Sequence, residues 1–260
     1  MTQDNRRSPA AFVREETHAF LIALQFLTRL PVTFEHPPDA GARGKSLPWY
    51  PAVGLLLGLL LTALGWLGSG MATGLHAALL LTAWVVMTGV LHLDGLADTA
   101  DAWVGGFGDR ERTLTIMKDP RSGPAAVTIL VLVLLLKFSA LIQLLHEGLW
   151  TLLVLPPLLG RTAALLLFLT TPYIRPSGLG SALSKHLPQR AGILSVATAT
   201  ATTLLLGQLS GLWILITATI LFLSFRGLLL SRLGGTTGDT AGALIELTET
   251  VILITLAIAT

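Results

Sequence analysis

Three aspartates between residues 92 and 119 have a spacing suited to binding a metal ion. Asp94, Asp98 and Asp101 are separated by four and then three residues, which places them within about 60° of one another on one face of an α-helix. Like charges stacked in this way repel one another, so a cation among them would be stabilising. Because the chain contains no cysteine and oxygen ligands favour hard cations, we expect Mg²⁺ rather than Zn²⁺. The alternative is a solvated helix end.

A second set of carboxylates follows a glycine-rich stretch near residue 235. Asp239 precedes an apolar segment, and Glu246, seven residues later, shares its helical face, with Glu249 one turn further on. Charge inside an apolar segment is costly and often functional. We therefore expect Asp239 either to cap the helix or to bind a metal ion, with Glu246 continuing a second acidic stripe on the same side as the first. His92, close to Asp94, is either a catalytic base or a hydrogen-bonded residue at an interface.

Two stretches have the composition of anion-binding loops. In 117–124, two cations and a hydroxyl (Lys118, Arg121 and Ser122) precede the start of an apolar segment, an arrangement suited to phosphate at a helix N-terminus. In 232–240, closely spaced glycines allow backbone N–H groups to turn towards an anion. The alternatives are an ordinary basic loop and an ordinary helix start. The candidate substrate-binding residues in the second stretch are Arg232, Gly235 and Thr237.

The elements that position these residues are expected to be membrane-spanning helices. Hydrophobic residues make up 52% of the 260 residues and charged residues 12%, with a mean hydropathy of +0.72, which is typical of an integral membrane protein. We predict an all-α, polytopic helical bundle. Residues 1–18 form a flexible segment and 19–260 a single membrane-embedded catalytic domain, which begins with an interfacial or re-entrant helix over 19–30. About seven spans follow, over 49–67, 75–93, 124–146, 149–171 (broken near 156–161), 192–206, 211–230 and 240–260.

The basic residues of the loops predict the orientation of these spans. Lys and Arg occur before Trp49 and in the loops 106–123, 172–191 and 231–239, whereas the alternate loops, 68–74, 147–148 and 207–210, contain none. The positive-inside rule places the first set in the cytoplasm, and with it the candidate site. A net charge of only +2 argues against nucleic acid as a partner. Lys137 and Arg161 lie within predicted spans and either neutralise internal carboxylates or contact a substrate.

The chain resembles the adenosylcobinamide-GDP ribazoletransferase family, the membrane-embedded cobalamin synthases. The resemblance rests on FLTRLPV at 26–32, WYPAVGLLLG at 49–58, LHLDGLADTADAWVGG at 91–106, DRERTLTIMKDPRSGPAAV at 109–127 and RLGGTTGDTAGALIELTE at 232–249. It implies a Mg²⁺-dependent enzyme of late vitamin B12 biosynthesis in a bacterial inner membrane. Such an enzyme joins adenosylcobinamide-GDP to α-ribazole, or to its 5′-phosphate, and releases GMP.

The resemblance also suggests roles for individual residues. Metal binding is expected at Asp94, Asp98, Asp101 and Asp239; catalytic roles extend to Glu246 and His92. Substrate binding is expected at Lys118, Arg121, Ser122, Arg29, Arg232, Gly235 and Thr237. Two kinds of partner stay open, which are further copies of this chain in a homo-oligomer and other enzymes of the corrinoid pathway.

Two other functions would account for parts of this pattern. A CDP-alcohol phosphotransferase of lipid synthesis would also place Asp-Gly and further aspartates at a helix end, but its pattern requires Arg where this chain has Asp98. An ion-coupled transporter would account for Lys137, Arg161, Glu249 and a broken span.

Overall fold

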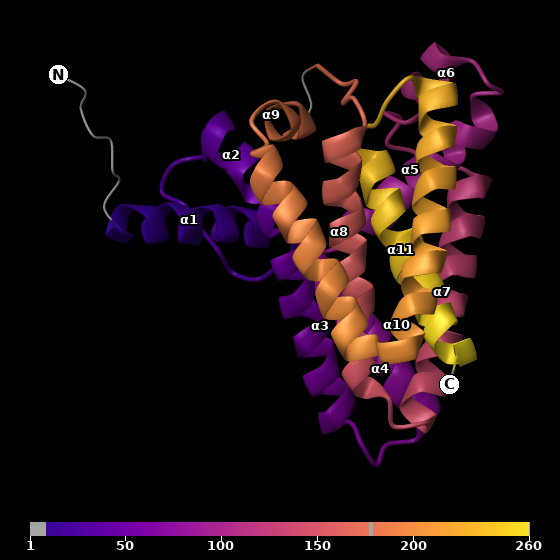
Figure 1. Ribbon diagram of the computed structural model, residues 1–260. Helices are drawn as coiled ribbons and strands as arrows, with labels where there is room; N and C mark the ends of the chain where they lie inside the picture. Colours follow the sequence, from indigo (N-terminus) through magenta and orange to yellow (C-terminus); the bar gives the residue numbers. More distant parts are fainter. Residues whose placement is uncertain (1–8, 177–178, 260) are drawn as a thin grey trace.

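The computed structural model describes residues 9–176 and 179–259, and this part of the chain is helical apart from one isolated β-bridge (Figure 1). Two short 3₁₀ turns precede α3 and α8. The elements are α1 (Pro9–Leu27), α2 (Ala40–Ser46), η1 (Leu47–Trp49), α3 (Tyr50–Leu67), α4 (Thr73–Thr88), α5 (Leu91–Gly105), α6 (Arg110–Ile116), α7 (Pro124–His146), η2 (Trp150–Val154), α8 (Leu155–Thr170), α9 (Leu179–Lys185), α10 (Gln189–Leu233) and α11 (Gly238–Ala259).

The centre of the bundle is formed by α8 and α11. Helix α8 packs closely against α3 and α11, and α11 packs against α5, α7 and α10 as well. Apolar side chains from these helices, among them Leu57, Leu165 and Leu244, are fully buried. In contrast, α7 and α10 expose many large apolar residues, as expected for helices that face lipid. The buried helices therefore carry the polar residues, and the outer ones provide the apolar surface.

Within the described part of the chain, five helices are long and apolar enough to cross a membrane, or six if α4 and α5 together count as one bent span. The predicted span 124–146 coincides with α7, and those at 49–67 and 240–260 correspond to α3 and α11, although Thr260 lies outside the described residues. The predicted spans 192–206 and 211–230 are the two arms of α10. Gln208 has non-helical φ/ψ of 49° and −123°, and the arms diverge from this bend (Figure 1). The number seven stays a prediction.

The predicted span 75–93 is wrong at its end. Helix α4 stops at Thr88, and α5 starts at Leu91 with its axis bent by 87° from that of α4. Gly89 and Val90 both have positive φ, at 62° and 65°, so the helix cannot continue through them. The carboxylate-bearing helix is therefore a separate element turned across the bundle, rather than the end of a span.

The predicted break near 156–161 is also misplaced. Pro156 and Pro157 lie in the first turn of α8, where η2 passes into the α-helix. Proline is tolerated there because its missing N–H would have no helical partner. Arg161 consequently lies inside a continuous helix.

Helix α1 runs across one end of the bundle, roughly perpendicular to α3 (Figure 1). This position agrees with the interfacial helix predicted over 19–30. The helix begins at Pro9, so the proposed boundary between residues 18 and 19 falls within it, while residues 1–8 lie outside the described part. The division into a flexible segment and one domain stays a prediction.

The basic and the uncharged connections lie at opposite ends of the bundle. In Figure 1, α2, α6, α9 and the start of α11 lie at the upper end, and the α3–α4 connection and the bend of α10 lie at the lower end. This separation is what the positive-inside rule requires of loops on two sides of a membrane.

A reporter fusion should locate the two ends. We expect a reporter fused after Thr260 to be periplasmic and one inserted at Lys185 to be cytoplasmic, because basic loops are retained inside. Alkaline phosphatase and green fluorescent protein activities of matched fusions measure this. Reporters found on the same side would contradict the predicted topology.

Candidate active site

The site is built where α5 crosses α11. A Cβ atom on Gly95 would lie 2.7 Å from the carbonyl oxygen of Asp239, and one on Gly242 would lie 3.4 Å from Cα of His92. Only residues without side chains let the two backbones approach so closely at Gly95. The crossing places Asp94 and Asp239, which are 145 positions apart in the sequence, beside the same cleft.

This cleft has a volume of about 260 Å³ and is lined by residues of α1, α3, α5, α8, α9, α11 and the α8–α9 connection. Its polar lining comprises His92, Asp94, Tyr50, Tyr173, Arg175 and Asp239. Nη1 of Arg175 lies 2.6 Å from Oδ2 of Asp239 in an ion pair. The rest of the lining is largely apolar, so charged groups in the cleft are only partly surrounded by water.

Several polar atoms around the cleft have no hydrogen-bond partner among the described residues. They are Oη of Tyr50, Nε2 of His92 and Nε of Arg175. Oδ2 of Asp239 has its partner in the Arg175 guanidinium, 2.6 Å away. Since buried polar groups are almost always hydrogen-bonded, three such atoms at one cleft indicate a polar ligand.

Arg175 reaches the cleft because its segment is fastened to the start of α11. The N–H of Ile174 donates to the carbonyl of Thr236 at 3.0 Å, and the N–H of Thr236 donates to Pro172 at 2.8 Å. A Cβ atom on Gly235 would lie 2.3 Å from the Pro172 oxygen, so this glycine is required for the contact. From the sequence, Arg175 is one of the basic residues of the loop 172–191, because nothing local in the sequence reveals a pairing between connections so far apart.

The three predicted aspartates lie near one another but differ in their partners. The two oxygens of Asp101 accept from the N–H groups of Gly123 at 2.5 Å and Ala126 at 2.9 Å, so this carboxylate caps the N-terminus of α7. Asp98 lies within electrostatic range of Asp94, Asp101, Asp239 and Arg175. The structure thus brings Asp239 to the predicted triad and gives Asp101 a capping role, while joint metal binding stays a prediction.

Carboxylates at the cleft are suited to a hard cation without forming a complete cage for it. Among residues 9–176 and 179–259, no three His, Asp or Glu side chains form a preformed metal site. Mg²⁺ is usually held by one or two carboxylates together with substrate phosphates. Asp94 and Asp239, which line the cleft, have the chemistry for that kind of site.

No residue of the loop 117–124 lines the cleft, although Nη2 of Arg175 donates to the carbonyl of Met117 at 3.4 Å. Lys118 and Ser122 are exposed. The Arg121 side chain is 86% exposed and pairs with Asp119 at 2.7 Å, and hydrogen bonds from Arg121 lower the pKa of Asp119 to about 2. The loop therefore neutralises part of its own charge, and its proposed phosphate role stays a prediction.

The glycine-rich stretch has a structural explanation. Thr237 and Thr240 cap α11 reciprocally, with N–H to Oγ1 distances of 3.2 Å and 2.9 Å, and Thr237 is fully buried. Arg232 donates to the Trp103 carbonyl at 3.1 Å and lies over its ring, which fastens α10 to α5. Chain packing and capping therefore account for Arg232, Gly235 and Thr237, and their anion-binding role stays a prediction.

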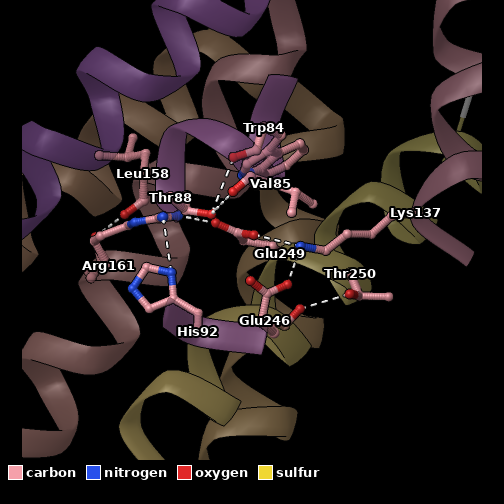
Figure 2. A network of polar contacts seen from close by, with 11 residues as sticks. Trp84, Val85, Thr88, His92, Lys137, Leu158, Arg161, Glu246, Glu249 and Thr250 are labelled. Atoms are coloured by element: carbon pink, nitrogen blue, oxygen red, sulfur yellow. Dashed lines mark hydrogen bonds and ion pairs between the residues drawn. The ribbon is translucent and has the colours of Figure 1, made fainter. Parts of the chain in front are cut away.

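A buried charge network lies next to the cleft (Figure 2). Nζ of Lys137 in α7 contacts Glu246 at 2.5 Å and Glu249 at 2.7 Å, and Arg161 in α8 pairs with the other oxygen of Glu249. All four side chains are at most 4% exposed. The expectation that Lys137 and Arg161 neutralise internal carboxylates is confirmed. Glu246 belongs to this network and does not line the cleft with Asp239.

Arg29 lines a second cavity of about 290 Å³, which shares Phe26, Leu91 and Leu183 with the cleft. Arg43 of α2 lines this cavity too, and no Asp or Glu does among the described residues. The two cavities therefore adjoin, with carboxylates and Arg175 lining one and two arginines lining the other.

These features define a polytopic helical membrane protein with a cleft of carboxylates and arginines at one end of its bundle. Residues 19–257 match the sequence model of the cobalamin-5-phosphate synthase family. The chain belongs to this family.

The curated relatives share most of the chain. Adenosylcobinamide-GDP ribazoletransferase of Pseudomonas fluorescens strain Pf-5 is 58% identical over 239 residues, covering 92% of this chain and 98% of the relative. The protein of the same name from Pseudomonas putida strain GB-1 is also 58% identical over 239 residues, with 92% and 98% covered. That from Pseudomonas putida strain W619 is 57% identical over 241 residues, with 93% and 99% covered. No solved structure matches the chain.

Proposed function

We propose that this protein is an adenosylcobinamide-GDP ribazoletransferase, which transfers the cobinamide phosphate group to α-ribazole or α-ribazole 5′-phosphate and releases GMP. The printed names of relatives that cover nearly the whole chain support this activity. The observation that carries it in the structure is the cleft in which Asp94, Asp239 and Arg175 meet among unpartnered polar atoms. Neither a CDP-alcohol phosphotransferase nor an ion-coupled transporter is favoured, because the similarity extends across the bundle.

The reaction needs positioning and charge neutralisation more than covalent help from the protein. A ribose hydroxyl of the acceptor forms a bond to the cobinamide-side phosphorus, the bond from that phosphorus to the bridging oxygen breaks, and the hydroxyl proton is released. GMP takes the bridging oxygen. Arg175 is placed to stabilise charge on the phosphoryl oxygens.

Mg²⁺ is the cofactor that we propose, with Asp94 and Asp239 holding it and Asp98 adding to the negative field. When bound, the ion neutralises charge on the pyrophosphate. Its ligand set is completed by substrate, which is consistent with two carboxylates at an open cleft.

The direct test is GMP release from adenosylcobinamide-GDP by the purified protein in detergent or nanodiscs, with and without Mg²⁺. Chromatography separates GMP from the GDP conjugate. We expect release that depends on the acceptor and on Mg²⁺. No GMP with either acceptor would overturn the proposed function, whereas full activity in the presence of a chelator would overturn the metal alone.

We further propose that the active side faces the cytoplasm of a bacterial inner membrane. The cleft lies at the end of the bundle that carries the basic connections, which supports this orientation.

Substitution of Gly95 by alanine should move Asp94 on α5 away from Asp239 on α11. The new Cβ would lie 2.7 Å from the Asp239 backbone, so α5 must move away from α11. We expect GMP release to fall about 10- to 100-fold, since misplacement by about 1 Å can cost 10²-fold. The matched control is Gly227→Ala in α10, where a Cβ meets nothing within 4 Å, and its activity should be unchanged. Equal rates for the two variants would contradict the close crossing as the basis of the site.

We propose that Arg29 and Arg43 receive the phosphate end of the acceptor, which is supported by the position of their cavity beside the cleft. Arg29→Gln should therefore raise the KM for α-ribazole 5′-phosphate by about tenfold, the effect of losing about 1.4 kcal/mol of charge-assisted binding. The KM for unphosphorylated α-ribazole should hardly change. Steady-state kinetics with both acceptors measures this difference. An equal change for the two acceptors would show that Arg29 does not contact the phosphate.

A further inference from the structure

One ring nitrogen of His92 faces a group that can only donate hydrogen bonds. Nη2 of Arg161 lies 3.4 Å from Nδ1 of His92 (Figure 2). A guanidinium group remains protonated in proteins and has no acceptor. Nδ1 must therefore offer its lone pair to Arg161. In a neutral imidazole the hydrogen then resides on the other nitrogen, Nε2.

The charge network disfavours a charged ring. Lys137 and Arg161 pair with Glu246 and Glu249, which makes two groups of each sign. A protonated His92 would add a fifth charge to this set, with its Nδ1–H directed at the Arg161 guanidinium. A buried charge without a partner is strongly disfavoured in a protein interior.

The remaining nitrogen has nothing to bind within the described chain. Nε2 of His92 is buried without a hydrogen-bond partner, and the residue is 2% exposed. His92 lines the cleft together with Asp94 and Arg175. A buried donor at the wall of a ligand cleft is satisfied when the ligand supplies an acceptor.

We propose that His92 donates a hydrogen bond from Nε2 to an oxygen of the phosphoryl group in the cleft, and that Arg161 is the positioning residue that fixes this tautomer. The inference rests on the proposed function and deepens it. It assigns His92 the role of donor and not that of base, because Nε2, the nitrogen without a partner in the described chain, already carries the hydrogen.

Amide variants distinguish a donor from a base. The side-chain nitrogen of Gln reaches the position of Nε2, whereas that of Asn lies near Nδ1, and neither amide accepts a proton at neutral pH. We expect His92→Gln to lose less than about tenfold in kcat, and His92→Asn and His92→Phe to lose about 10²–10³-fold, the usual effect of removing one donor to a developing charge. Thermal unfolding and gel filtration establish that each variant is folded.

The outcomes separate this inference from the proposed function. If the wild type is active and His92→Gln is as impaired as His92→Phe, the donor role alone is overturned. Wild-type rates in all three variants would overturn the donor role as well. Absence of GMP release by the wild type would overturn the proposed function itself.

The tautomer can be observed without turnover. In protein labelled with [¹⁵N]histidine, the His92 signal is identified by its loss in His92→Gln, and we expect Nδ1 to resonate as an unprotonated nitrogen and Nε2 as a protonated one. A hydrogen on Nδ1 would overturn the inference whatever the activity.

A charge-balanced double variant tests the positioning role of Arg161. Arg161→Met with Glu249→Gln removes one charge of each sign and leaves Lys137 paired with Glu246, so the network stays neutral. We expect kcat to fall about tenfold with an unchanged KM, together with a mixture of His92 tautomers, since the donor to Nδ1 is lost. A single Nε2–H tautomer and an unchanged kcat in this variant would show that Arg161 does not position the ring.

Discussion

Replacing Asp94 by asparagine is expected to lower the rate of GMP release by about 10²–10³-fold, the usual cost of removing one positioned electrostatic group. The metal-free protein should be at least as stable as the wild type. Asp94 is exposed at the cleft and lies within range of the negative charge of Asp98, so its neutralisation removes repulsion. The measurements are GMP release against Mg²⁺ concentration and thermal unfolding without Mg²⁺.

The same substitution at Asp101, on the same helix, is the control. Its two oxygens bind two N–H groups at the start of α7, and an amide retains only one acceptor and no charge. We expect Asp101→Asn to lose about 1–2 kcal/mol of stability, as caps of this kind contribute, with turnover retained in the folded fraction. The reverse pattern, with Asp101→Asn inactive but stable and Asp94→Asn active, would show that the cleft is not where the carboxylates act.

Substitution of Lys137 by methionine is expected to reduce the free energy of unfolding by about 3–5 kcal/mol, the effect of breaking a buried ion pair from one side. Lys137 is 3% exposed, contacts two glutamates and lies 4.7 Å from the centre of the Trp84 ring. Without it, two buried carboxylates share the single charge of Arg161. The loss of stability is measured from the fraction of unfolded protein as a function of the concentration of denaturing detergent.

Charge balance should restore most of that stability. Lys137→Met combined with Glu246→Gln leaves Arg161 paired with Glu249, and buried ion pairs are often replaceable at little net cost. Lys45→Met is the surface control, because Lys45 pairs with Glu15 where both side chains are at least 31% exposed, and exposed pairs contribute at most about 1 kcal/mol. A double variant as unstable as Lys137→Met would indicate that packing of the lysine chain matters more than its charge.

The apolar helices were the most predictable part of the fold. Helix α7 runs from Pro124 to His146, as predicted, because proline at its start and a long apolar run define it locally. The break between α4 and α5 was not predictable from residue types. Gly89 suits a positive φ, but Val90 at φ 65° is a β-branched residue in a conformation that such residues rarely adopt, so only tertiary packing accounts for it.

The site was predictable in its carboxylates and less so in their partners. Asp94 and Asp239 reach one cleft, as the acidic stripes suggested. Helical periodicity places side chains on a face but does not reveal which neighbouring helix that face meets. For this reason the sequence could not reveal three features of the packed helices. They are the capping role of Asp101, the pairing of Arg175 with Asp239 and the burial of Glu246.

The charge network also bears on how the chain enters the membrane during synthesis. Lys137 and Arg161 lie on helices that leave the ribosome before α11, which supplies both of their carboxylates. A Lys or Arg at the centre of an inserted helix costs about 2.5–3.5 kcal/mol on translocon scales. Until α11 is made, the insertion of α7 and α8 into lipid is therefore unfavourable. Nascent chains that end before residue 238 should stay bound to the translocon or to insertion chaperones. Completion of the bundle is in this way coupled to translation of its final charged helix.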